Sequence, residues 1–233
     1  MKSVRFNISR ITIIAILLAT LGCQTAQIEV APDLAAVSPM DVQGANPRRW
    51  NAPVRFGPWA TSEVREGGTW GFGYRLLGID AGFAFQPYRL SIASGDRTIH
   101  AECVTRAAVM SRKSLSVDPS FGKIPALGCG FHGDGEGTLR LNTTAMNREE
   151  GQIEFGSSVW QIRSIHKYAS SSIPSGQPLG YEILSGGRVI ATVETINRGR
   201  VWIDPSLNAD DQARIAAVAT AALLYDPANT EQE

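Results

Sequence analysis

Residue types that usually carry chemistry are scarce in this 233-residue chain, which has three histidines and three cysteines. The sequence contains no G-x-S-x-G, H-E-x-x-H or phosphate-loop motif, the usual signatures of serine hydrolases, zinc proteases and nucleotide-binding enzymes. Residues 71–73 read Gly-Phe-Gly but lack the third glycine and the helix of a dinucleotide-binding fingerprint. We therefore expect no enzymatic activity, no catalytic residue and no cofactor.

Neither sign of charge is in excess, since 22 basic residues face 22 acidic ones. Lys2, Arg5 and Arg10 lie in residues 1–22, which contain no acidic residue, so the remainder carries 19 basic against 22 acidic side chains. A slightly acidic surface offers no counter-charge to a phosphate backbone, and we expect no nucleic-acid partner.

The sequence also has no apolar run long enough to cross a bilayer, for which about 20 residues are needed. Its apolar N-terminal stretch, residues 11–21, is shorter and follows the basic residues of the first ten positions. This order is typical of an export signal that is removed. Residues 1–22 are therefore predicted to be a signal peptide.

Residues 19–23 read Ala-Thr-Leu-Gly-Cys and resemble the lipobox of bacterial lipoproteins, although Thr20 stands where that family usually has Leu. The resemblance implies cleavage before Cys23 and attachment of diacylglycerol and an acyl chain there, which makes the membrane a partner. In lipoproteins with enterobacterial-type sorting, a residue other than Asp next to the cysteine, here Gln24, implies the outer membrane, with the domain facing the periplasm. The alternative is an ordinary signal peptide with an incidental cysteine.

Residues 23–52 contain three prolines and no sustained apolar periodicity, which indicates a flexible, lipidated tether. A globular domain is predicted over 53–228 and a disordered tail over 229–233. Within the domain, Cys103 and Cys129 remain as a pair once Cys23 is assigned to lipid. In an oxidising compartment an even remainder predicts a disulfide.

From residue 54 onward, short segments alternate between polar and apolar residues, which is typical of half-buried strands. The clearest examples are residues 98–103, 138–142 and 152–155. Short turns rich in Gly, Asn and Asp separate such segments and favour an antiparallel meander, because parallel strands need long crossovers.

One strong helix is predicted, over residues 208–225, with Asn208 as its N-cap and Pro227 beyond its end. Residues 215–225 read IAAVATAALLY and are apolar on every side apart from Thr220. A helix that is apolar all round must be buried all round. Since it is too short to span a bilayer, the strands of the chain are expected to enclose it.

The last 45 or so residues resemble the ending of the tubby-like superfamily, which includes the phospholipid scramblases: two hairpin strands, a short acidic turn and a central helix. The resemblance implies a β-barrel closed around the C-terminal helix, and a lipid-associated or regulatory binding protein. It transfers no functional residue. The alternative fold is a lipocalin-like barrel with an external helix, suggested by Gly68-Thr69-Trp70.

One arrangement of polar residues deserves a hypothesis. If Cys103 and Cys129 face each other on neighbouring antiparallel strands, the same register places His100 opposite His132, with Glu102 one diagonal away. Such a cluster could hold a transition metal, but without a fourth ligand it is more simply a set of exposed strand residues.

The leading functional hypothesis is a non-enzymatic binding or assembly module of the cell envelope, acting on a protein or lipid partner. The alternative is a lipocalin-like carrier of a small apolar ligand.

Overall fold

The computed structural model describes residues 26–45, 53–68, 70–76, 79–112, 115–116, 126–144 and 147–225. The predicted signal peptide, the lipid attachment at Cys23 and the C-terminal tail lie outside these residues. Of the segments described here, no helix is long and apolar enough to cross a membrane.

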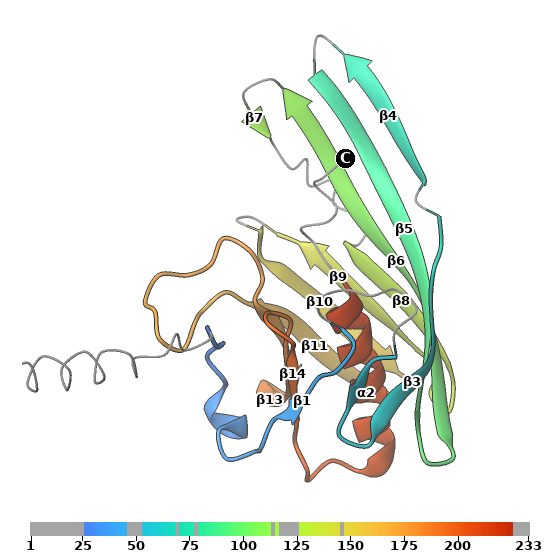
Figure 1. Ribbon diagram of the computed structural model, residues 1–233, viewed down its shortest axis with the longest axis vertical. Helices are drawn as coiled ribbons and strands as arrows, with labels where there is room; N and C mark the ends of the chain where they lie inside the picture. The colour runs from blue at the N-terminus through green and yellow to red at the C-terminus, as the bar shows by residue number, and fades with distance from the viewer. Residues whose placement is uncertain are drawn as a thin grey trace, which may run out of the picture.

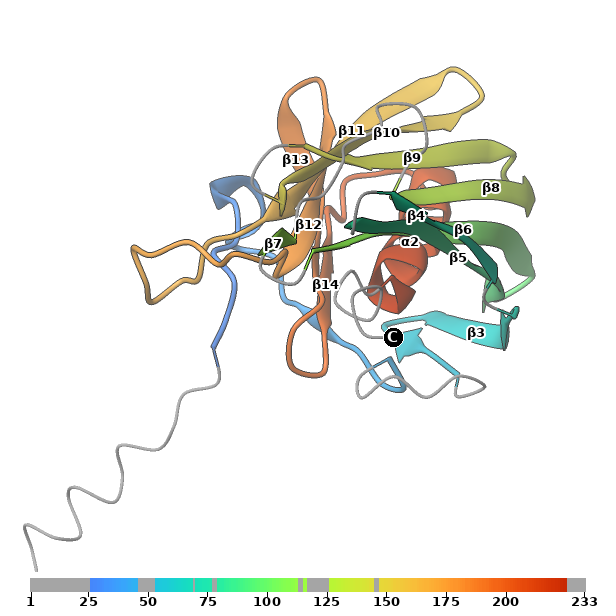
Figure 2. The ribbon, with the colours of Figure 1, turned by 90° about the horizontal axis from the view of Figure 1, so that it is seen from above.

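The fold is mainly β: one antiparallel sheet of 14 strands, twelve of which follow one another in a nearly closed barrel (Figures 1 and 2). Its two ends meet where the Gln43 and Arg55 backbones exchange two hydrogen bonds of 2.9 Å. The strands are β1 (Met40–Asp41), β2 (Arg55–Phe56), β3 (Trp59–Glu66), β4 (Trp70–Leu76), β5 (Ile79–Ser94), β6 (Arg97–Arg112), β7 (Leu115–Ser116), β8 (Leu127–Gly133), β9 (Gly137–Thr143), β10 (Glu149–Phe155), β11 (Ser158–Ile165), β12 (Gly180–Ser185), β13 (Arg188–Glu194) and β14 (Arg200–Ile203).

Neighbouring strands are joined in sequence order from β8 to β14, as predicted for a meander. The β12–β13 turn shows why its residues are glycines: Gly186 and Gly187 have φ of 58° and 85°. Two consecutive positive φ angles suit a tight hairpin turn whose twist matches that of the strands. The alternation predicted from sequence is also confirmed. Ile99, Ala101 and Cys103 are buried, whereas the intervening His100 and Glu102 are exposed.

Helix α2 (Ala209–Leu224) runs through the middle of the barrel, as Figure 2 shows. It begins at Asn208, whose side chain accepts a hydrogen bond from the Asp211 backbone, and every residue of the apolar segment 215–225 is buried. Thr220, the one polar side chain among helical residues 215–224, donates to the Ala216 carbonyl at 2.8 Å. The prediction of an enclosed helix is confirmed, and the external helix of the lipocalin alternative is wrong.

The predicted disulfide is present between Cys103 on β6 and Cys129 on β8, which are direct partners in the register of the two strands. Both cysteines are buried in the main core. The bond links neighbouring strands whose cysteines are 26 residues apart in sequence.

The predicted flexible tether is wrong for residues 26–45, which are docked on the outer face of β12, β13 and β14. Ile28 and Leu34, the latter in the short helix η1 (Pro32–Leu34), are buried beside Val189 and Trp202 in a second apolar cluster. β1 extends the sheet by pairing with β14. These contacts form because the outer face of these strands carries the apolar side chains of Leu184, Val189 and Trp202, which need a cover.

A first prediction concerns the space around α2. Ala217 is completely buried, so Ala217→Leu forces three more carbons into a filled barrel. Overpacking of this kind costs about 1–3 kcal/mol, which urea denaturation would detect as a lower free energy of unfolding. Ala209→Leu is the matched control, since Ala209 is exposed at the start of the same helix. An equal loss in both variants would contradict an enclosing barrel.

A second prediction concerns the disulfide. Closing a chain segment of 26 residues stabilises the folded state by about 3–4 kcal/mol in the chain-entropy model. Denaturant unfolding with and without a thiol reductant should therefore differ by that amount. The double variant Cys103→Ala/Cys129→Ala provides the control, because its stability should not respond to the reductant.

Candidate functional site

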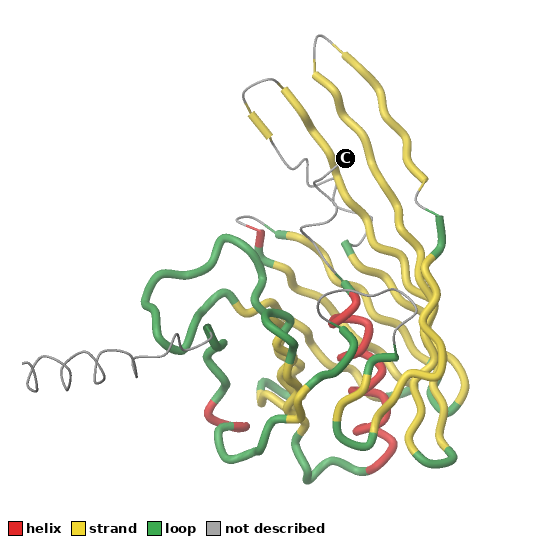
Figure 3. The backbone as a smooth tube through the Cα atoms, in the orientation of Figure 1, coloured by secondary structure: helices red, strands yellow, loops and turns green. Residues whose placement is uncertain are grey.

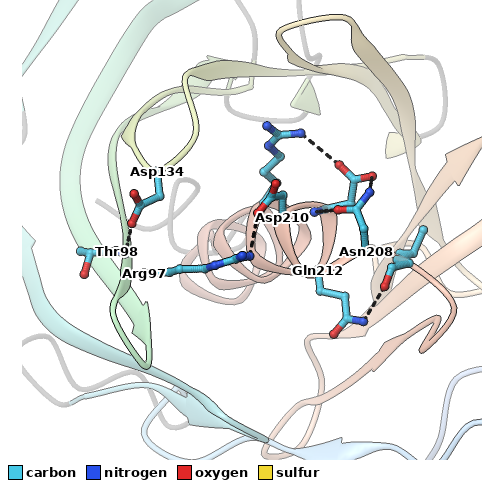
Figure 4. A network of polar contacts seen from close by, with 9 residues as sticks. Arg97, Thr98, Asp134, Asn208, Asp210 and Gln212 are labelled. Atoms are coloured by element: carbon cyan, nitrogen blue, oxygen red, sulfur yellow. Dashed lines mark hydrogen bonds and ion pairs between the residues drawn. The ribbon is translucent and has the colours of Figure 1, made fainter.

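Different polar networks lie at the two ends of α2, and the first surrounds its N-terminus (Figure 4). Arg97 forms an ion pair with Asp210 at 2.7 Å, and Gln212 donates to the Leu207 carbonyl at 2.8 Å. On the neighbouring β8–β9 turn, Asp134 accepts from the backbone of residue 98 at 2.6 Å. Acidic side chains in the first turn of a helix stabilise its dipole, so this network fixes α2 in the barrel.

The other end of α2 carries a buried carboxyl between two tyrosines. Glu149, at the start of β10, is 2% exposed. Tyr181 on β12 donates to Oε2 at 2.6 Å and Tyr225, which follows α2, donates to Oε1 at 2.7 Å. Nearby, the Tyr88 hydroxyl donates to the Ala221 carbonyl at 2.9 Å. The cluster joins the wall of the barrel to the last turn of the helix.

Burial decides the ionisation of this cluster. It raises the pKa of Glu149 against the two tyrosine hydrogen bonds, which act to lower it. It also raises the pKa of Tyr181 and Tyr225 well above 10.0, so both remain protonated donors. A perturbed carboxyl is a common mark of an active site, but here the tyrosines and the end of α2 occupy its surroundings. The cluster links β10 and β12 to the residue that follows α2.

The hypothesis about the histidines is confirmed in its geometry. His100 and His132 are direct partners on β6 and β8, in the register set by the disulfide. His100 Nδ1 lies 2.7 Å from Ser91 Oγ, whereas Glu102 pairs with Arg89 at 3.1 Å. The part of the chain that the structure describes contains no group of three or more His, Cys, Asp or Glu side chains suited to a metal ion. Both histidines are exposed on the outer surface of the barrel.

The docked N-terminal segment defines a further surface, formed with the loop between β11 and β12. The Gln27 carbonyl accepts from the Ala169 backbone at 2.8 Å, and Glu29 N donates to the Lys167 carbonyl at 3.0 Å. Ile28 bridges to Tyr168 between these contacts. We call this surface, residues 26–29 with the loop 166–175, the anchor face, because the chain enters the domain there.

Exposed large apolar residues also occur on other elements, at Trp70, Val104 and Val159. The ends of β4, β5 and β6 project beyond the barrel (Figures 1 and 3), and at the base of this projection Trp70 is 51% exposed and stacks on Phe85 at 4.6 Å. Val159 is exposed at the β10–β11 hairpin. These positions lie on elements other than the anchor face.

Sequence reasoning found the cysteines and histidines and missed Glu149, the two tyrosines and the anchor face. Comparison with known proteins adds no assignment: no family model, no curated protein and no solved structure matches this chain.

A third prediction follows from the raised pKa of Glu149. Because the folded state holds this proton more tightly than the unfolded one, the stability gained from it is complete below the ordinary pKa of 4.5 and is lost as pH rises through the folded-state value. Glu149→Gln removes the titrating group. The free energy of unfolding of the wild type, relative to this variant, should therefore fall as pH rises above 4.5. Urea unfolding at a series of pH values measures the difference.

The neighbouring Glu150→Gln is the control, since residue 150 is exposed on the same strand. Its pH profile should follow the wild type. A wild-type profile that runs parallel to that of Glu149→Gln would show that burial does not govern this carboxyl.

Proposed function

We propose that this protein is a lipoprotein of the bacterial cell envelope, anchored by lipid on Cys23, whose domain acts as a non-enzymatic binding or assembly module. The observation that carries the second part is the position of α2. Residues 215–225 occupy the interior of the barrel, where a carrier protein would keep its ligand. This disfavours the lipocalin-like carrier and leaves the outer surface to perform the function.

The first part of the proposal rests on residues 1–23. The basic start, the short apolar stretch and the small residues before Cys23 form the ordered pattern of a lipoprotein export signal. The Cys103–Cys129 disulfide is consistent with an oxidising compartment. With Gln24 after the cysteine, we place the protein in the outer membrane with its domain in the periplasm.

The partners of two buried acidic residues also support a function on the outer surface. The clearest buried acid, Glu149, is engaged by two tyrosine hydroxyls, and the buried Glu194 by Arg200 at 2.6 Å. Both carboxyls are used inside the structure. The resemblance to the tubby-like superfamily adds the expectation of a lipid-associated or regulatory role, with a lipid or an envelope protein as partner.

A fourth prediction tests the anchor. Cys23→Ser removes the thiol that would receive diacylglycerol, so expression in a bacterial host supplied with a labelled fatty acid should give no labelled protein. The variant should also leave the membrane fraction. Intact-mass spectrometry of the wild type should show Cys23 as the first residue, carrying lipid.

Thr20→Leu is the matched control, because it restores the residue usual in the lipobox and should keep or increase labelling. Wild-type protein that begins elsewhere than Cys23, or carries no lipid, would refute the anchor. It would leave the argument about the filled barrel unchanged.

A further inference from the structure

Only Gln24 and Thr25 separate the proposed lipid attachment at Cys23 from Ala26, the first described residue. An extended chain covers at most about 3.5 Å per residue, so three steps along the chain reach about 10 Å. The headgroup layer of one leaflet is about 5–8 Å thick. A lipid on Cys23 therefore holds Ala26 next to the headgroups, which a flexible tether over residues 23–52 would not do.

The position of Ala26 on the domain is fixed by a chain of polar contacts. Its carbonyl accepts from Asn197 Nδ2 at 2.7 Å, and the same nitrogen lies 3.2 Å from Glu194 Oε1. Glu194 is 1% exposed and is held by the Arg200 guanidinium, with both contacts at 2.6 Å. Because a buried, paired carboxylate orients Asn197, the N-terminal segment enters the domain at one defined place.

The loop 166–175 is the part of the domain that this arrangement brings to the membrane. Its base is closed by two bonds between His166 and Ser175: the Ser175 backbone donates to the His166 carbonyl at 2.6 Å, and His166 Nδ1 donates to the Ser175 carbonyl at 3.0 Å. Ala169 in the loop binds the Gln27 carbonyl. Four residues further on, Ile173 is 74% exposed, more than any other large apolar residue recorded for the described segments.

Resting on the proposed lipid anchor, we propose that the loop 166–175 is the surface by which the barrel contacts the bilayer, with Ile173 inserted among the headgroups. An apolar side chain gains free energy when it leaves water, and the bilayer interface lies within reach of this loop. Arg198, exposed next to Asn197 where the N-terminal segment meets the domain, adds attraction to anionic lipids. Lys167 is also exposed, but it forms an ion pair with Glu29 at 2.6 Å. The barrel thus has a defined orientation on the membrane.

A spin label attached to Ile173→Cys tests the proposal in the full lipidated protein on vesicles of phosphatidylethanolamine and phosphatidylglycerol. The label reacts at this one thiol, because Cys103 and Cys129 are joined and Cys23 carries lipid. Val159→Cys is the matched control, because Val159 is also apolar and is 54% exposed. It lies on β11, the strand that leads into the loop, six residues before the end of that strand. Six residues of strand span about 20 Å.

Relaxation measurements should show that the label at 173 loses accessibility to a water-soluble nickel chelate and gains accessibility to oxygen when vesicles are added. The label at 159 should remain accessible to the chelate. Mass spectrometry of each sample reports the lipid on Cys23.

A lipidated protein whose label at 173 stays in water on vesicles overturns this proposal and leaves the anchored lipoprotein intact. A label at 173 that is protected in native envelope membranes but not on the lipid vesicles also overturns the proposal, because it would assign the loop to a protein partner. Protein without lipid on Cys23 overturns the anchor and this inference together.

Discussion

The structure depends on the burial of one short helix that has no polar face. Residues 215–225 cannot be left against water on any side, and sixteen helical residues are too few to cross a bilayer comfortably. The sheet meets this constraint by closing around the helix. Because seven of the sixteen residues of α2 are alanine, the backbone of the helix can lie close to the strands. Both helix ends need polar partners. The Asp210 network and the Glu149 cluster supply them.

Much of this fold could be predicted from sequence because two periodicities were clear. Alternation with period two identified strands, and the absence of any polar stripe identified the enclosed helix. The register of β6 and β8 could be derived from the cysteines alone, since a disulfide between facing positions fixes every other pair on those strands. His100 and His132 are partners for that reason. The relation to the tubby-like superfamily stays a prediction, because the comparisons do not test it.

Glu149 was missed although the same alternation contains it. On β10, Phe155 and Ile153 face the core of the barrel. Counting back from Ile153 in steps of two residues leads to Gly151 and then to Glu149, which therefore also faces inward. An acidic residue at an inward position calls for buried donors, and the tyrosines that supply them come from residues 181 and 225, far away in sequence. The position could be read from the pattern, whereas the partners depend on closure of the barrel.

The docking of the N-terminal segment was missed for a different reason: the sequence pattern that indicates it lies in the strands that the segment covers. Ile28, Leu34 and Val42 follow no periodicity, so the segment itself gives no indication of order. The indication comes from β12 and β13, which are buried on nearly every residue instead of every second one. Strands buried on both faces must be covered on both faces. The helix covers the inner one, and the outer one needs a second cover, which the chain before residue 46 provides. This cover also shortens the connection to Cys23 and so determines which part of the barrel a lipid anchor would hold against the membrane.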